Sequence, residues 1–354
     1  MKPSFQNVLE AARDRMAMLF DRFERVVVSV SGGKDSTVVY HLALEAAEAR
    51  GRTVEVMFLD QEAEYQGTVD QIDYMMRHHL VIPRWFQVPM RLTNATSPMD
   101  TWLHAWRDGD DWLRPLSDIG THVLSGAPDR FYEFFPWYEQ TSKVPTAWVV
   151  GLRSRESLNR WRSMAKNPGF DGIFWSTKTK AKDGFRFYPI FDWNVGDVWK
   201  FISDSGVRYN RVYDAMFAIK GANQRTVRVS NLVHEQAFKA LADLQEIEPE
   251  TYERLVHRLG GVHCAALYAA DRNVYDAKSL PAAFNTWRSY RDHLLATTPI
   301  DYLGHFQRRF ARQPTDEATC REHVRQILTN DWEDNVPVRR VKADRLRMCW
   351  WDRL

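Results

Sequence analysis

A short run of glycine, lysine, aspartate and serine near the N-terminus has the composition of a phosphate-binding loop. Residues 31–36 read Ser-Gly-Gly-Lys-Asp-Ser. Gly32 and Gly33 allow backbone N–H groups to approach a ligand without a Cβ in the way. Lys34 adds a positive charge, and Ser36 adds a hydroxyl donor. These groups suit a phosphate or pyrophosphate, although their spacing matches neither the Walker A pattern G-x-x-x-x-G-K-[ST] nor the dinucleotide pattern G-x-G-x-x-G.

The residues on either side of this loop predict the elements that position it. Residues 26–30 have high β-propensity, and an apolar pattern of helical period covers residues 36–50. A strand, a tight loop and a helix N-terminus are therefore expected in that order. The unpaired N–H groups and the positive dipole end of such a helix favour an anion. The alternative is a Gly-Gly turn that only exposes a lysine.

The next segments continue the alternation of strands and helices. A strand over residues 53–59 ends at Asp60, a helix is expected over 68–79, and a short strand over 85–88. This order predicts an α/β fold with a doubly wound, mostly parallel sheet. Because ligands bind outside the carboxyl ends of parallel strands, Asp60 is expected beside the loop.

A second strand-to-loop junction repeats the anion-binding pattern. A buried strand is expected over residues 145–150, and Gly151 and Arg153 follow it. Arg153 is therefore a candidate for a second phosphate contact. The alternative is a surface ion pair between Arg153 or Arg155 and Glu156.

Two domains are expected from the change of pattern along the chain. Residues 1–230 would form the nucleotide-binding α/β domain, with an aromatic-rich insertion of short helices and loops at about 90–143. The aromatic residues beside arginines in this insertion could stack on bases, or they could form core. Residues 231–354 are nearly all helical in period and would form a C-terminal helical region with a basic tail.

Basic residues gather in two further segments. Residues 154–186 carry an excess of lysine and arginine and include a hairpin pattern with a lysine-rich tip, and residues 338–354 form the basic tail. Either segment could bind a nucleic acid, or it could simply be a solvated face.

The composition indicates an ordinary globular protein. The 354 residues are 44% hydrophobic and 27% charged, with a net charge of +2. No apolar run approaches the roughly 20 residues of a membrane span, and the N-terminus has the pattern of an amphipathic helix, so a cytoplasmic protein without membrane contact is expected. Cys264, Cys320 and Cys349 form no C-x-x-C pair, which predicts neither zinc nor an iron–sulfur cluster and leaves their role open.

Three motifs together resemble the phosphoadenosine phosphosulfate (PAPS) reductase family of the PP-loop ATP pyrophosphatase superfamily. They are the loop at 31–36, the G-x-R-x-x-x-S element at 151–157 and the P-x-x-D-W-x-x-x-D-V-W segment at 189–199. The resemblance implies an adenine nucleotide, ATP or PAPS, with its phosphates on the first loop. The binding residues it implies are Ser31, Gly32, Gly33, Lys34, Asp35, Ser36, Asp60, Gly151, Arg153 and Ser157.

The chain also departs from the reductases. Residues 60–68 keep only Asp60, an aromatic residue and Thr68 of the reductase pattern D-T-G-x-x-F-x-E-T, and nothing matches the catalytic E-C-G-L-H motif. Thiol-driven reduction is therefore not expected. The whole chain looks more like a PAPS reductase-like subgroup without an assigned reaction, whose members often occur with a ParB/sulfiredoxin-like partner.

These features predict an enzyme that cleaves ATP between the α- and β-phosphates to adenylate an acceptor, with sulfur transfer or nucleic-acid modification as its purpose. Lys34, Asp35 and Arg153 are the expected catalytic residues. Mg²⁺ would be held by Asp35 and Asp60, because a hard cation prefers carboxylates. Glu62 and Glu64 are further candidate contacts. The alternatives are a PAPS-processing enzyme that uses an external thiol, and a regulator that senses nucleotides or binds nucleic acid without turnover.

Overall fold

The computed structural model describes residues 7–97, 100–156, 161, 169–181, 184–220, 229, 231–234, 240–268, 277, 279–297, 300–332 and 334. The chain divides into two compact units. The first contains residues 1–92, 104–232 and 243–258, and the second contains residues 93–103, 233–242 and 259–354. The expected two-domain boundary at residue 230 stays a prediction, because compact units defined by contacts need not fold separately.

The first unit is built on a seven-stranded sheet, with the order β6-β3-β2-β1-β7-β9-β8. All neighbouring strands pair in parallel except β8 and β9, which form the predicted antiparallel hairpin. The central register places Val27 of β1 opposite Glu55 of β2 and Trp148 of β7. The strands are β1 (Arg25–Ser29), β2 (Val54–Leu59), β3 (Val81–Phe86), β6 (Gly120–Thr121), β7 (Thr146–Val150), β8 (Ser176–Lys178) and β9 (Gly184–Phe187). The predicted doubly wound α/β fold is therefore confirmed.

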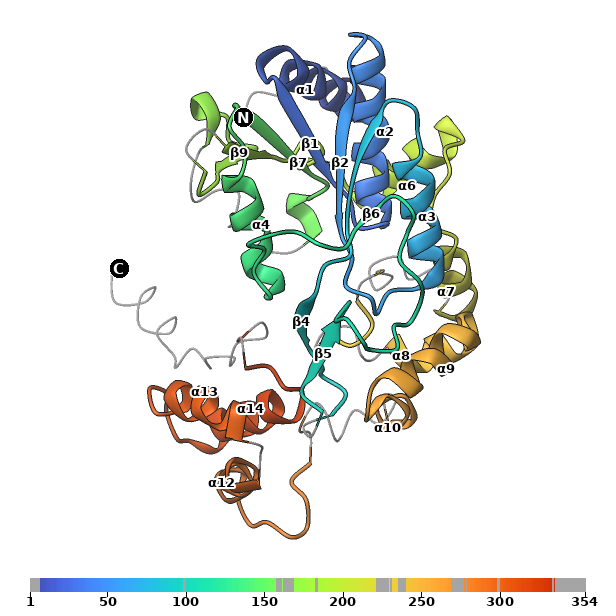
Figure 1. Cartoon of the computed structure of the whole chain (residues 1–354). Coiled ribbons are helices and arrows are strands. Elements are labelled where there is room, and N and C mark those ends of the chain that lie inside the picture. Colours follow the sequence, from blue (N-terminus) through green and yellow to red (C-terminus); the bar gives the residue numbers. More distant parts are fainter. Residues whose placement is uncertain are drawn as a thin grey trace, which may run out of the picture. The chain divides into compact units, whose positions relative to one another are not determined.

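Helices cover both faces of this sheet, and alternate residues of each strand face each layer. Val26 and Val28 point into the larger core, with apolar residues of α1 (Val8–Arg22), α2 (Lys34–Glu48), α3 (Gln66–Met76) and α6 (Val195–Ser205). On the opposite face, Tyr138 of α4 (Phe131–Gln140) packs edge-on against Trp148 of β7. Figure 1 shows α2, α3 and α6 on one side of the sheet and α4 on the other.

The helix ends follow the capping signals of the sequence. Asn194 caps α6 through a complete capping box with Asp197. Pro249 occupies the first turn of α9 (Pro249–Arg258), where a missing N–H is harmless. The next helix, α7, spans Val212–Lys220.

The aromatic-rich insertion contains strands that the sequence pattern did not predict. These are β4 (Met90–Thr93), β5 (Trp102–Ala105) and β6, which extends the main sheet beside β3. Each has at most four residues, too few for a strand period to be recognised. The side chain of Phe134 packs on Phe86. Phe134 is therefore a core residue, which favours the second of the two interpretations of these aromatic residues, core formation, over base stacking.

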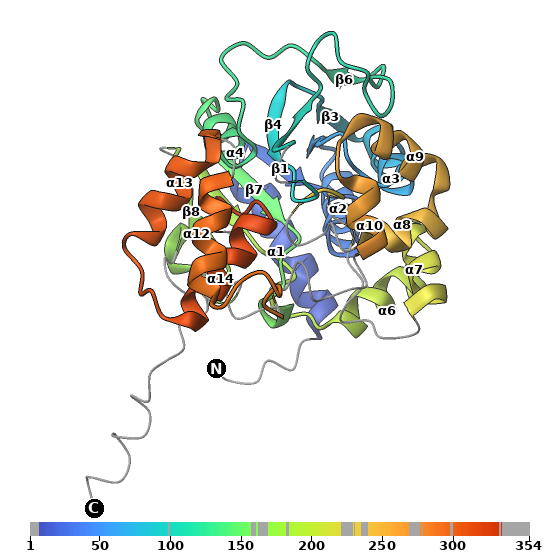
Figure 2. The same ribbon diagram turned by 90° about the horizontal axis from the view of Figure 1, so that it is seen from below.

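The second unit is helical, which confirms the expected C-terminal region. Its helices include α10 (Val262–Tyr268), α12 (Trp287–Thr297), α13 (Ile300–Phe310) and α14 (Glu317–Leu328). In Figure 2, α12, α13 and α14 lie side by side, and α13 and α14 share an apolar cluster of Phe306, Phe310 and Ile327. Residues 231–234 lie outside any described helix, residues 235–239 lie outside the described part of the chain, and α8 spans Leu241–Ile247.

Two of the three cysteines fall within described helices. Cys264 is exposed on α10, and Cys320 is buried on α14, while Cys349 lies outside the described residues. Across the described parts of the chain, no helix combines the length and the apolar character that crossing a membrane requires.

Candidate functional site

The loop at residues 31–36 joins β1 to α2, and its first glycine is required by the local packing. Gly32 has a φ of +66°, and a Cβ there would lie 2.7 Å from Cγ2 of Thr68. Gly33 is the N-cap of α2 and has no side chain to satisfy the first N–H groups of that helix. The loop therefore lies against the first turn of α3 and leaves the N-terminus of α2 suited to an anion.

Hydrogen bonds within the loop hold this conformation. Ser36 Oγ accepts from the N–H of Ser31 at 3.2 Å and donates to the carbonyl of Gly33 at 2.9 Å. Ser36, one of the predicted binding residues, thus stabilises the conformation of the loop itself. The hydroxyl of Ser36 is engaged in the loop itself in this structure.

Two residues that the sequence analysis did not single out support the loop from the segment before α7 and from α7 itself. Asn210 Nδ2 donates to the carbonyl of Gly32 at 3.1 Å and to Oγ1 of Thr68 at 2.9 Å. The hydroxyl of Tyr213 accepts from the N–H of Lys34 at 3.2 Å. Both lie almost 180 residues after the loop, so no local pattern could have linked them to it.

The two predicted cations converge on Asp35. Lys34 Nζ lies 3.1 Å from one carboxylate oxygen of Asp35, and Arg153 Nε donates to the other. Lys34 is 7% exposed and Arg153 is 5% exposed. Because both cations are buried, they need a negative partner, and Asp35 supplies it here. An incoming phosphate could take over the same role.

A close backbone approach brings Arg153 to this position. A Cβ at Gly151 would lie 2.8 Å from the carbonyl oxygen of Asp35. Glycine is therefore the residue that allows the end of β7 to contact the first turn of α2. The structure thus brings together Lys34, Asp35, Gly151 and Arg153, whereas the predicted Ser157 lies outside the described residues.

Asp60, at the end of β2, is the hub of a separate buried network. One of its carboxylate oxygens accepts from the N–H of Glu62 at 2.9 Å and from an Nη of Arg114. The other accepts from Trp85 Nε1 at 2.9 Å and from Gln87 Nε2 at 3.2 Å. Asp60 is 0% exposed. These four donors use the four lone-pair directions of the carboxylate.

Glu62 ties this network to distant parts of the chain. It is fully buried at a φ of +64°, and its carboxylate accepts from the backbone N–H groups of Trp106 and Leu113 and from Arg258 Nε at 2.8 Å. Such a φ is unfavourable for a residue with a Cβ. The three donors compensate for it, so Glu62 fixes the insertion and α9. In this structure Glu62 therefore has a structural role and is not a solvated side chain.

Glu64 has few polar partners of its own. Gln61 Nε2 approaches its carboxylate at 3.4 Å. The pKa of Glu64 is raised to about 8, mainly by burial and also by the nearby Asp60, while Arg114 opposes the change. At neutral pH Glu64 is therefore mostly protonated and is a poor ligand for a hard cation.

The predicted Mg²⁺ ligands do not fit a cation in this structure. Asp60 has no free lone pair, and both oxygens of Asp35 already face cationic groups, which a metal ion would have to displace. Within the described residues, no group of three His, Cys, Asp or Glu side chains could hold a metal.

The predicted nucleic-acid contacts find no support in the site. Trp106 is fully buried, its Nε1 donates to the carbonyl of Asp60, and its ring lies 5.2 Å from the guanidinium of Arg114. This tryptophan is therefore core rather than a stacking platform. Much of the basic segment 154–186 and all of the tail at 338–354 lie outside the described residues.

A glycine-rich loop that carries Lys34 at the end of the first strand of a doubly wound sheet, with a second buried cation, Arg153, at a neighbouring strand end, is typical of nucleotide-binding α/β proteins. Residues 25–267 match the family described as phosphoadenosine phosphosulfate reductase domain. Since this match covers more than half of the 354 residues, the chain belongs to the PAPS reductase family of the PP-loop superfamily. Residues 221–340 also match a domain of unknown function, DUF3440.

The individual proteins that resemble this chain share less than a third of their aligned residues with it. The chain is 28% identical over 327 residues to the uncharacterized protein YbdN of Escherichia coli K12, covering 86% of this chain and 79% of that protein. It is 25% identical over 193 residues to sulfate adenylyltransferase subunit 2 of Mycobacterium sp. strain KMS, covering 54% of this chain and 59% of the relative. It is 23% identical over 212 residues to adenosine 5′-phosphosulfate reductase of Oceanobacillus iheyensis, covering 58% and 73%. The family thus includes enzymes that are named for adenylyl and sulfonucleotide chemistry.

Proposed function

We propose that the protein is a PP-loop enzyme that cleaves ATP between the α- and β-phosphates and transfers the adenylyl group to an acceptor. The observation that carries this proposal is the pair of buried cations, Lys34 and Arg153, that share Asp35 at the N-terminus of α2. Two buried cations at a helix N-terminus provide more positive charge than one carboxylate needs. A pyrophosphate group carries enough charge to engage both.

The reaction follows from these positions. An anionic oxygen or sulfur of the acceptor attacks the α-phosphorus and forms the new bond to it. The bond from the α-phosphorus to the bridging oxygen breaks, and pyrophosphate leaves with that electron pair. Lys34 stabilises the charge that develops on the leaving group, and Arg153 orients a phosphate through its guanidinium. Apart from the bond to Asp35 through Nε, Arg153 makes no hydrogen bond to another described residue, so its Nη groups can serve a ligand.

The test is to incubate the full-length protein with α-labelled ATP, Mg²⁺ and candidate acceptors, and to follow AMP-containing products and pyrophosphate. We expect both to form in equal amounts, and to be lost in Lys34→Ala. A matched control is Arg13→Ala, which removes an exposed, ion-paired arginine of α1. Release of ADP and orthophosphate alone, or no turnover with any acceptor, would contradict the proposal.

A second candidate function has support from the family match. We propose as the alternative that the loop binds PAPS or a related sulfonucleotide and that an external thiol acts on its sulfonate. The match to the PAPS reductase domain and the similarity to an adenosine 5′-phosphosulfate reductase favour it. The chain lacks the E-C-G-L-H motif, so the thiol would come from another molecule.

Competition between ATP and PAPS for the free protein separates the two functions. Isothermal titration should show at least tenfold preference for the true substrate, since a lost charged contact is worth about 1.5–3 kcal/mol. A preference for ATP supports adenylyl transfer. A preference for PAPS, together with sulfite release when thioredoxin or glutathione is added, supports the alternative.

A further inference from the structure

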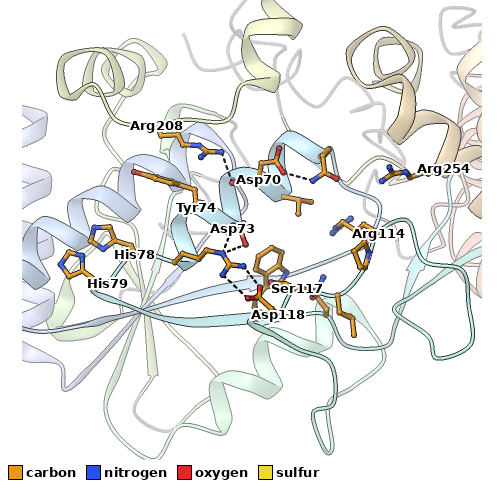
Figure 3. Close-up of a pocket in the computed structure, with 17 residues that line it drawn as sticks. Asp70, Asp73, Tyr74, His78, His79, Arg114, Ser117, Asp118, Arg208 and Arg254 are labelled. Atoms are coloured by element: carbon orange, nitrogen blue, oxygen red, sulfur yellow. Dashed lines mark hydrogen bonds and ion pairs between the residues drawn. The ribbon is translucent and has the colours of Figure 1, made fainter.

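A pocket of about 1100 Å³ lies beside α3, in the first unit of the chain. It is bounded by α3 on one side and by the segment at residues 114–118 on the other (Figure 3). None of residues 31–36, and not Arg153, lines this pocket. A cavity of this size is large enough to bury most of a small organic molecule. The nucleotide chemistry proposed above makes no use of it.

Two arginines, Arg114 and Arg254, lie at one end of this pocket, and Arg114 is also paired through an Nη with the buried Asp60. Arg114 is only 8% exposed in its side chain, and its Nε finds no hydrogen-bond acceptor in the described part of the chain. Arg254 of α9 has its nearest carboxylate, Glu250, at 3.6 Å. Figure 3 places the two arginines on the same side of the pocket.

These two arginines also line an adjoining pocket of about 640 Å³, so they stand where two cavities meet. A buried N–H without an acceptor costs free energy, which an oxygen atom of a ligand would recover. A carboxylate or phosphate would therefore be favoured at this end, where a half-exposed and a buried guanidinium are both within the pocket lining.

The middle of the pocket has a different electrostatic character. Arg77, the C-cap residue of α3, is shared between Asp73 at 2.9 Å and Asp118 of the opposite wall. One cation thus faces two carboxylates, so an anionic group is disfavoured there. The ligand's charge is directed toward Arg114 and Arg254 instead.

Apolar and aromatic side chains supply the remaining surface. Val69, Trp85, Pro115 and Leu116 line the pocket, and Tyr74 is 38% exposed. The guanidinium of Arg208 lies 4.8 Å from the ring centroid of Tyr74 and holds that ring in place. A flat apolar body would be buried against these side chains.

We propose that this pocket is a second ligand site, separate from the nucleotide loop, for a small organic anion. The anion's carboxylate or phosphate contacts Arg114 and Arg254, and its apolar body lies along Tyr74 and Leu116. This site does not depend on which reaction the nucleotide loop performs.

The test uses phenyl phosphate and benzoate as probes and benzyl alcohol as a neutral analogue of similar size. Each is titrated into the full-length protein and followed by ligand-detected NMR. We expect both anions to bind with dissociation constants of about 1 mM or below, and benzyl alcohol at least tenfold more weakly. The tighter of the two anions identifies the preferred charged group.

Variants locate the binding. Arg254→Glu should weaken both anions at least tenfold, because it reverses an accessible charge at the end of the pocket that carries the two arginines. Tyr74→Ala should weaken phenyl phosphate but leave inorganic phosphate unchanged. Arg13→Glu on α1 is the matched control and should change nothing, and Lys34→Ala should retain phenyl phosphate binding. Arg114 is not substituted, because Asp60 would lose its partner.

Several results would overturn the proposal. Binding that disappears in Lys34→Ala would place the probes in the nucleotide loop. Equal binding of benzyl alcohol would show an apolar cavity without anion recognition. Unchanged binding in Arg254→Glu, or no binding of either anion at about 10 mM, would also be incompatible with an anion site here.

Discussion

Asp35 and Asp60 follow two neighbouring parallel strands, yet their surroundings give them different roles. Asp35 faces two cations, Lys34 and Arg153, and 17% of its side chain remains exposed. Asp60 is fully buried and accepts four hydrogen bonds from neutral and cationic donors. The first carboxylate can exchange its partners for a ligand, whereas the second is fixed in the fold. Position at a strand end therefore does not by itself make a carboxylate functional.

Substitution of the fully buried Asp60 should have the largest effect on the free energy of unfolding. Asp60→Asn replaces an oxygen that accepts hydrogen bonds by an amide that donates them, and it leaves the buried Arg114 without a charged partner. We expect a loss of about 3–5 kcal/mol in the free energy of unfolding, measured by urea denaturation. Asp35→Asn should lose less, about 1.5–3 kcal/mol, because 17% of the Asp35 side chain is exposed, although the two cations that it leaves without a carboxylate are buried. Equal losses would show that the two sites do not differ in this way.

Removing a cation from the exchangeable site should abolish ligand binding without unfolding the protein. Lys34→Ala is expected to weaken ATP about 100-fold, since a charged contact is worth up to about 3 kcal/mol. Isothermal titration measures the affinity, and circular dichroism checks the fold. Arg13→Ala again serves as the control. An affinity within threefold of the unchanged protein would rule out a phosphate contact at this lysine.

The buried Glu64 beside Asp60 makes stability depend on pH. Its pKa is about 8 in the folded protein and near the ordinary glutamate value in the unfolded chain, so the folded state holds the extra proton between these values. Stability from this group is complete at low pH and is lost as the pH rises toward 8. The loss can reach about 1.4 kcal/mol per pH unit.

The comparison of unchanged protein with Glu64→Gln isolates this effect. The buried His41, with its pKa lowered to about 4, changes stability only below about pH 6.5. Urea denaturation between pH 6.5 and 8 should therefore show falling stability in the unchanged protein and a flatter dependence in Glu64→Gln. Parallel curves for the two proteins would mean that Glu64 titrates normally.

The smallest expected effect is a change in pyrophosphate affinity that tests the role of Asp35. If this carboxylate occupies the place of a phosphate, Asp35→Asn should bind pyrophosphate about three- to tenfold more tightly, because the competing internal anion is gone. Titrations with and without Mg²⁺ measure this. A metal ligand at this position would give the opposite sign, with weaker binding only when Mg²⁺ is present.

The sequence was sufficient to predict the fold and the strand–loop–helix conformation around residues 31–36, because both rest on local patterns. The strand and helix periods identified the parallel sheet, and residues 31–36 needed only their own glycines and the helix that follows. Arg153 was also predicted, since Gly151 and the strand before it carried the same signal. Each of these predictions depended on fewer than about fifteen consecutive residues.

The surroundings of Asp60 could not be predicted in this way. Its partners Trp85, Gln87 and Arg114 lie 25 to 54 residues later in the chain, in segments without a recognisable motif. Glu62 replaces the glycine of the reductase pattern and keeps the left-handed backbone that glycine favours. A glutamate in place of this glycine indicates that its carboxylate has a buried partner, but only the tertiary structure identifies the partners as Trp106, Leu113 and Arg258.

The ion pair between Glu62 and Arg258 also affects when this part of the chain can fold during translation. The two residues are separated by 196 positions. At about 5–20 residues per second, a ribosome needs on the order of 10–40 s to make Arg258 after Glu62 has appeared. During that time the glutamate lacks the charge that compensates its burial. The strand end beside the nucleotide loop can therefore reach its final conformation only late in translation, after the sheet that contains it has been made.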